Sequence, residues 1–161
     1  MRLRELDVFF FDLDGCLYFT DQPAPGSGDM IETLRRDGKK VGFITNNSRN
    51  TGAEIAEKLT NMGIRAYAEE VFAATEITGA FVKERCGVVS VKAAGSESLK
   101  RSLAGWGHRV TELDDEDVPA DVVVIGRDTE FTFDKLLRIA EWERRGAVIV
   151  AANPDAWHPG P

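Results

Sequence analysis

Short apolar runs alternate along the 161-residue chain with stretches in which apolar residues recur three and four positions apart. The runs predict strands, and the stretches with the longer period predict helices. Because almost every expected strand is followed by an expected helix, the pattern indicates an α/β fold with parallel sheets and crossover helices. The expected strands are 7–13, 40–45, 88–93, 122–125 and 147–151, and the expected helices are 29–36, 51–62, 96–104 and 132–145, with a short apolar start and a helix over 71–85.

The first strand ends in a motif that indicates chemistry. Its residues 8–11 are continuously apolar, which is typical of a strand buried on both faces of a parallel sheet. Asp12 and Asp14 follow with Gly15, and side chains two residues apart in an extended segment share a direction. We therefore expect both carboxylates in one small volume beyond the strand, where open α/β sheets bind ligands. One carboxylate can then act as a nucleophile or metal ligand while the other transfers a proton. An ordinary acidic turn is the alternative that the motif alone leaves open.

A second polar group follows the second strand. Thr45 ends this strand, and Asn46 and Asn47 come directly after it. The carboxyl ends of parallel strands meet at one edge of a sheet, so we expect these residues beside Asp12 and Asp14. A hydroxyl and backbone N–H groups at such a turn suit the oxygens of a phosphate. The same residue types are also common in loops and helix caps, and that interpretation stays open for Thr45 taken alone.

Composition excludes several classes of function. The chain has 20 Lys and Arg against 27 Asp and Glu, a net charge of −7, which argues against a nucleic-acid-binding surface. It has no run of about 18 apolar residues, so no membrane-spanning segment is expected. The N-terminus lacks the apolar segment of a signal peptide, and we expect a cytoplasmic protein. Cys16 and Cys86 are far apart, which favours two reduced thiols over a disulfide or a zinc site.

With these motifs the chain resembles the haloacid dehalogenase superfamily of aspartate-nucleophile phosphatases. Within it, the chain is similar to the branch of 4-nitrophenyl phosphatases and of NagD-type, phosphoglycolate and pyridoxal phosphate phosphatases. The matching segments cover nearly the whole sequence and are therefore more specific than the two aspartates alone. They are VFFFDLDGCLY (8–18), PG (25–26), GFITNNS (42–48), KLTNMGI (58–64), VVVIGRDTEFTFDKL (122–136) and AANPD (151–155).

The resemblance implies a role for each candidate residue. Asp12 would be the nucleophile that accepts the phosphoryl group, and Asp14 would be the general acid and then the general base. Mg²⁺ would be bound by the Asp12 carboxylate and the Asp14 backbone carbonyl. The substrate would be a small phosphorylated metabolite. The residues that would bind its phosphate are Leu13, Thr45, Asn46 and Asn47.

The resemblance also implies two domains, and it does not extend to the last part of the family pattern. Residues 1–86 would be the N-terminal part of a Rossmann-like phosphatase core, and residues 87–161 an inserted α/β cap domain. The family pattern continues beyond the cap with a lysine and an acidic pair that completes the magnesium site, whereas this chain stops at Pro161. We therefore expect weak Mg²⁺ binding by these residues and a fragment of a longer enzyme. The alternative is a homodimer in which a second copy covers the edge of the first strand.

Three functions are compatible with these residues. The leading hypothesis is an Mg²⁺-dependent phosphomonoester hydrolase that works through an aspartyl-phosphate. The second is a catalytically inactive chain of the same fold that binds a phosphorylated ligand or self-associates. The third is a phosphotransferase or mutase, because the nucleophile alone does not choose between water and another acceptor.

Overall fold

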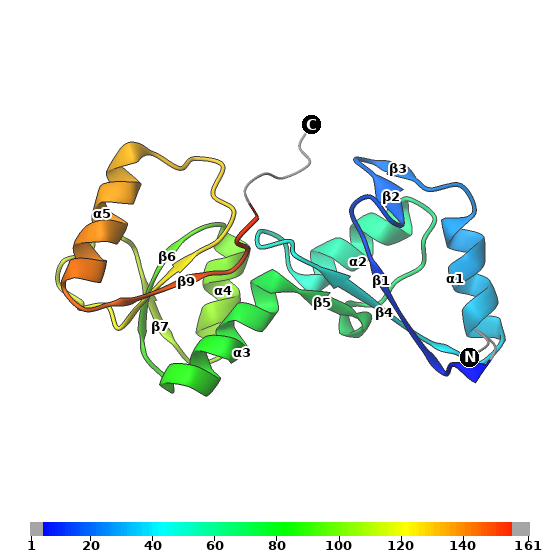
Figure 1. Ribbon diagram of the computed structural model, residues 1–161, viewed down its shortest axis with the longest axis horizontal. Helices are drawn as coiled ribbons and strands as arrows, with labels where there is room; N and C mark the ends of the chain where they lie inside the picture. Colours follow the sequence, from blue (N-terminus) through cyan, green and yellow to red (C-terminus); the bar gives the residue numbers. More distant parts are fainter. Residues whose placement is uncertain (1–4, 156–161) are drawn as a thin grey trace. The chain divides into compact units, whose positions relative to one another are not determined.

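Strands followed by helices make up both units of the chain in the computed structural model, which describes residues 5–155 (Figure 1). The first unit consists mainly of residues up to Thr45 and of 52–72, and the second of residues 46–51 and 73–154. The mixed α/β class expected from the sequence is confirmed. The chain returns from the second unit to the first at Gly52 and again at Asp155.

The first unit is built around a sheet in the order β1-β4-β5. β1 and β4 are parallel, with Phe9 opposite Val41 and Phe11 opposite Phe43. Phe43 is fully buried, and helix α1 packs against β4. A two-stranded hairpin, β2 with β3, was not expected, because each of its strands has only two residues. The elements are β1 (Val8–Asp12), β2 (Tyr18–Phe19), β3 (Gln22–Pro23), α1 (Ser27–Arg36), β4 (Lys40–Thr45), α2 (Gly52–Asn61), a 3₁₀ turn (Ala68–Glu70) and β5 (Val71–Ala73).

β1 differs from the expectation that it is buried on both faces. It is the edge strand of the sheet, and the side chains of Val8 and Phe10 are 47% and 55% exposed. Ile44 in β4 is also exposed, and Phe72 contacts Phe10 edge to face with ring centroids 5.7 Å apart. Burial on both faces is therefore wrong for this chain, since only one face of the sheet is covered among the described residues. The expectation that a further part of the chain or a second copy covers the edge of β1 stays a prediction.

The second unit contains a four-stranded parallel sheet in the order β7-β6-β8-β9. The sequence predicted all of its elements except β7, which has only three residues and lies at the edge beside β6. The chain adds β7 at one edge of the sheet, beside β6, and β9 at the other edge, beside β8. The elements are α3 (Ala74–Cys86), β6 (Ser90–Ala94), α4 (Glu97–Gly105), β7 (Arg109–Thr111), β8 (Val122–Ile125), α5 (Phe133–Arg144) and β9 (Val148–Ala151).

The apolar strand β8 explains why this sheet is covered on both faces. Val122 and Val124 pack in one cluster with residues of α3 and α4, including Leu99. Val123 points to the opposite cluster, where it meets Trp142 of α5. Each of the three valines is at most 1% exposed. A continuous apolar run in this position is therefore the pattern of a strand between two helical layers.

Lys92 is hydrogen-bonded to the acidic segment 112–119, for which the sequence alone predicts a solvated loop. The Lys92 side chain is fully buried, and its Nζ donates hydrogen bonds to Thr111 Oγ1 and Glu112 O at 3.0 Å and to Asp115 O at 2.5 Å. It also lies 4.6 Å from the ring centroid of Trp142. Burial lowers the pKa of Lys92, while nearby acidic groups, Asp115 first, oppose that shift. An internal ammonium group thus satisfies backbone carbonyls of this loop.

The division into a core of residues 1–86 and a cap of residues 87–161 stays a prediction. The two compact units place α3 with the second unit, so their boundary in this region follows Phe72 rather than Cys86. Over residues 5–155, no helix has the length and apolar character needed to cross a membrane.

Candidate active site

The carboxyl ends of β1 and β4 lie side by side in the first unit. Asp12, the last residue of β1, is opposite Ile44, so its backbone is one position from that of Thr45 at the end of β4. Asp12 is exposed and Thr45 is 5% exposed. The parallel pairing therefore brings the two predicted positions to one edge of the sheet, as expected. The convergence of their side chains on one anion stays a prediction.

A tight turn after β1 fixes where Asp14 lies. Leu13 O accepts hydrogen bonds from Cys16 N at 3.2 Å and from Leu17 N at 3.0 Å, and the Leu13 side chain is fully buried. Gly15 has a φ of 80°, a left-handed conformation that favours glycine. The chain thus reverses directly after the second aspartate. Because the Leu13 side chain is in the core, a contact between Leu13 and a phosphate has to come from its main chain.

Tyr18 contacts the candidate site, although the sequence assigned it no role. Its hydroxyl donates a hydrogen bond of 3.0 Å to Asp14 Oδ2, and the residue is 4% exposed. Burial and then the Asp14 carboxylate hold the pKa of Tyr18 above its ordinary range, with a smaller effect from Asp12. Tyr18 therefore remains a hydrogen-bond donor at all moderate pH values. The Nζ of Lys58 lies over the Tyr18 ring, 4.6 Å from its centroid, which is a cation–π contact.

Asn46 and Asn47 follow Thr45 directly but belong by their contacts to the second unit. Asn47 Oδ1 accepts hydrogen bonds from Arg49 N at 2.9 Å and from Asn50 N at 2.8 Å, which closes a turn typical of asparagine. The Asn47 side chain thus has a structural role in this turn, as the loop interpretation expects. Phosphate binding by Asn46 and Asn47 stays a prediction.

The oxygen donors at Asp12 and Asp14 fit a hard cation such as Mg²⁺ in chemical type. Mg²⁺ prefers six oxygen ligands and usually keeps several waters, so one carboxylate and one carbonyl form only part of a site. Among residues 5–155, no group of three or more His, Cys, Asp or Glu side chains is arranged to hold a metal ion. The donors of this chain are therefore suited to magnesium but would need further ligands for tight binding.

Replacing Tyr18 tests whether its hydrogen bond orients Asp14. In the complete gene product we expect Tyr18→Phe to lower kcat/KM for an alkyl phosphate by about fivefold, since one hydrogen bond contributes about 1 kcal/mol. Tyr67, the chain's other tyrosine, is exposed, and Tyr67→Phe provides the matched control. Equal kcat/KM values for the two variants would show that Tyr18 does not position Asp14.

Comparison with known proteins identifies relatives over most of the chain. Residues 9–109 match a family model described as haloacid dehalogenase-like hydrolase. An acid sugar phosphatase of Staphylococcus aureus is 32% identical over 153 residues, which are 95% of this chain and 58% of that protein. The corresponding protein of Staphylococcus saprophyticus is 31% identical over the same share of both chains.

Solved structures show the same similarity. A 4-nitrophenylphosphatase of Thermotoga maritima has a TM-score of 0.86 and 31% identity, over 98% of this chain and 59% of that one. A protein named nagD has a TM-score of 0.87 at 31% identity, over 99% of this chain and 61% of its own. A glycerol phosphate phosphatase of Mycobacterium tuberculosis, solved in complex with magnesium, has a TM-score of 0.82 and 28% identity, over 94% and 45%. The chain thus spans about three fifths or less of the length of these relatives.

Proposed function

Because the chain belongs to the haloacid dehalogenase-like hydrolase family, in its NagD-type branch, we propose that the protein hydrolyses phosphomonoesters of small metabolites through an aspartyl-phosphate on Asp12. The observation that carries this proposal is the position of Asp12 at the carboxyl end of β1, one residue out of register with Thr45 at the end of β4. Asp14 follows at once and is held by Tyr18. A nucleophile, a proton donor and a hydroxyl thus come from one edge of one sheet.

The proposed reaction has two displacements at phosphorus. A carboxylate oxygen of Asp12 attacks the phosphorus atom, and the bond to the ester oxygen breaks as that oxygen takes a proton from Asp14. Water then attacks the phosphorus of the aspartyl-phosphate while Asp14 accepts a proton from it. The bond to Asp12 breaks, and inorganic phosphate and the free Asp12 carboxylate result. Asp14 ends in the protonation state in which it began.

The phosphate is held, in this proposal, by the Thr45 hydroxyl and by main-chain N–H groups of Leu13, Asn46 and Asn47. Such donors stabilise the negative charge on the oxygens that do not react, and they act strongly when they are fixed in advance. Mg²⁺, bound through the Asp12 carboxylate and the Asp14 carbonyl, would add positive charge beside the same oxygens. The magnesium complex of the glycerol phosphate phosphatase supports the choice of a divalent cation.

The names of the relatives support a small substrate that carries hydroxyl groups. One is an acid sugar phosphatase and another a glycerol phosphate phosphatase, so a sugar phosphate or a polyol phosphate is the substrate class that we propose. A short phosphorylated acid and a nucleotide are the further members of a useful test panel. In this proposal the second unit serves as the cap that selects among leaving groups.

A substrate panel with and without metal tests the proposal. We expect the complete gene product to release phosphate from at least one sugar or polyol phosphate with Mg²⁺ present. We expect at least a hundredfold loss after EDTA, and recovery on addition of excess Mg²⁺, because the cation neutralises charge at the reacting phosphate. Release of phosphate that is unaffected by EDTA would contradict the metal requirement. No turnover of any panel member would contradict the proposed activity and favour the inactive, ligand-binding alternative.

A further inference from the structure

Residues 46–50, which we call the 46–50 loop, follow Thr45 and form several hydrogen bonds with other residues of the second unit. The carbonyl oxygen of Asn47 accepts hydrogen bonds from Thr75 N at 3.1 Å and from Thr75 Oγ1 at 3.0 Å. Ser48 is 3% exposed, and its Oγ accepts a hydrogen bond of 2.9 Å from Arg127 N. The loop thus has fixed partners in α3 and in the segment after β8.

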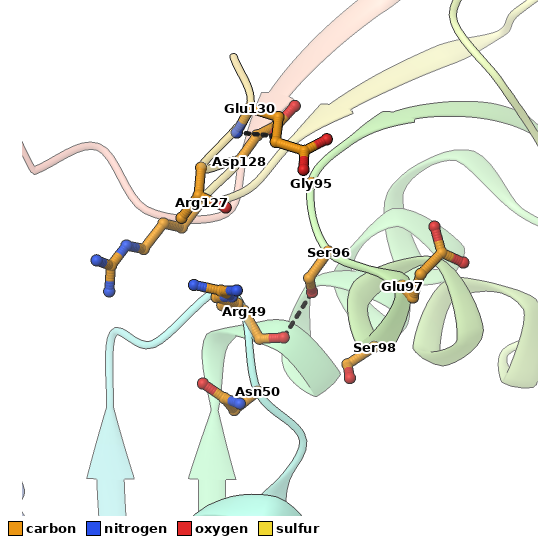
Figure 2. Close-up of a pocket in the computed structure, with 10 residues that line it drawn as sticks. Arg49, Asn50, Gly95, Ser96, Glu97, Ser98, Arg127, Asp128 and Glu130 are labelled. Atoms are coloured by element: carbon orange, nitrogen blue, oxygen red, sulfur yellow. Dashed lines mark hydrogen bonds between the residues drawn. The ribbon is translucent and has the colours of Figure 1, made fainter.

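Gly126 allows the loop to approach the sheet closely. A Cβ atom at this position would lie 2.9 Å from the carbonyl oxygen of Ser48, a distance that real Cβ atoms do not adopt. Gly126 N donates to Ala94 O at 2.8 Å, which ties the end of β8 to the end of β6. The loop therefore packs where these two neighbouring strands end, beside a cavity of about 440 Å³ (Figure 2).

Ser96 makes two different hydrogen bonds at this place. As the N-cap of α4, its Oγ accepts a hydrogen bond of 3.2 Å from Leu99 N. The same hydroxyl donates a hydrogen bond of 2.5 Å to the carbonyl oxygen of Arg49, which Figure 2 shows as a dashed line. A cap needs only an acceptor, and every N-cap side chain with an oxygen can supply that. The donated bond is an additional feature, and it ends on the 46–50 loop.

We propose that Ser96 is a positioning residue for phosphate binding, because its donated hydrogen bond to Arg49 fixes the 46–50 loop. The inference rests on the proposed function, in which N–H groups of Asn46 and Asn47 bind the phosphate. Donors that are held in place before the anion arrives bind it without a cost of ordering. The Ser48 and Gly126 contacts fix the middle of the loop, and Ser96 fixes the carbonyl next along it.

Four variants of the complete gene product separate the cap from the donated bond. Ser96→Thr keeps an acceptor and a donor, Ser96→Asp keeps the acceptor only, and Ser96→Ala removes both. Thr132 caps α5 by accepting a hydrogen bond of 3.2 Å from Lys135 N, so Thr132→Ala is the matched control for a lost cap. The readouts are the dissociation constant of inorganic phosphate, the melting temperature, and hydrogen–deuterium exchange of the peptide that covers the 46–50 loop.

We expect Ser96→Asp and Ser96→Ala to weaken phosphate binding by about fivefold to tenfold and to speed exchange in the 46–50 loop, since both lose one hydrogen bond to it. Ser96→Thr should bind phosphate like the wild type. Thr132→Ala should lower the melting temperature by an amount similar to Ser96→Ala and leave phosphate binding unchanged. If Ser96→Asp matches the wild type in loop exchange, Ser96 is only a helix cap and the inference is wrong.

The same series distinguishes this inference from the proposed function. Turnover of a phosphomonoester by the wild type, with loop exchange unaffected by Ser96→Asp, would overturn the inference and leave the proposed function standing. A wild type that neither hydrolyses phosphomonoesters nor binds inorganic phosphate would overturn both. Faster exchange in the Ser96→Asp variant together with weaker phosphate binding would support both.

Discussion

Substitution Asp12→Asn is expected to lower kcat for a phosphomonoester by about 10⁴-fold or more in the complete gene product. The amide has nearly the same shape as the carboxylate but is a poor nucleophile, so the first displacement fails, and loss of a nucleophile costs up to about 10⁶ in a well-studied hydrolase. The measurement is steady-state release of phosphate, with circular dichroism to check that the variant is folded. Residual activity near the wild-type level would show that another group attacks the phosphorus.

A control for this substitution is available at the other end of β1. Asp7 precedes the strand, is largely exposed, and pairs with Lys39 at 3.4 Å. Asp7→Asn makes the same chemical change where the strand begins, away from its carboxyl end. We expect Asp7→Asn to leave kcat unchanged, since surface ion pairs contribute at most about 1 kcal/mol to stability. A similar loss in both variants would indicate that β1 is disturbed generally and that Asp12 has no special role.

Substitution Asp14→Asn is expected to reduce kcat/KM by about 10² to 10⁴ for an alkyl phosphate such as glycerol phosphate, the range for loss of a general acid. The loss should be much smaller for 4-nitrophenyl phosphate, because 4-nitrophenolate leaves without needing a proton. The comparison of the two substrates in one variant therefore isolates the proton transfer to the leaving oxygen. Equal losses for both substrates would contradict the role of Asp14 as general acid.

The strands and helices were largely predictable because most of them obey a clear period. β4 and β8 have the predicted bounds, 40–45 and 122–125. β8 is a continuous apolar run, and in β4 the apolar residues Val41, Phe43 and Ile44 lie between Lys40 and Thr45. β7 was missed because three residues carry no measurable period and its pairing with β6 depends on residues far away in the sequence. The exposure of Val8 and Phe10 was missed for a related reason, because an apolar run does not show whether other chain covers it.

The candidate site was predictable in part. The placement of Asp12 and Thr45 at one edge follows from two parallel strands and needs no side-chain detail. The role of Tyr18 toward Asp14 was not assigned, because the turn that brings them together depends on backbone hydrogen bonds to Leu13. The contact of Ser96 with Arg49 joins residues 47 positions apart, and no local pattern encodes it.

The phosphoenzyme itself provides the most direct test of the central claim, that Asp12 receives the phosphoryl group. The complete gene product is quenched during turnover of a phosphomonoester, reduced with borohydride, digested and analysed by mass spectrometry. An aspartyl-phosphate is a mixed anhydride, which borohydride reduces to an alcohol, so we expect homoserine at position 12 and at no other aspartate. Homoserine at a different position, or active turnover with no reduced aspartate at any time of quenching, would contradict the claim.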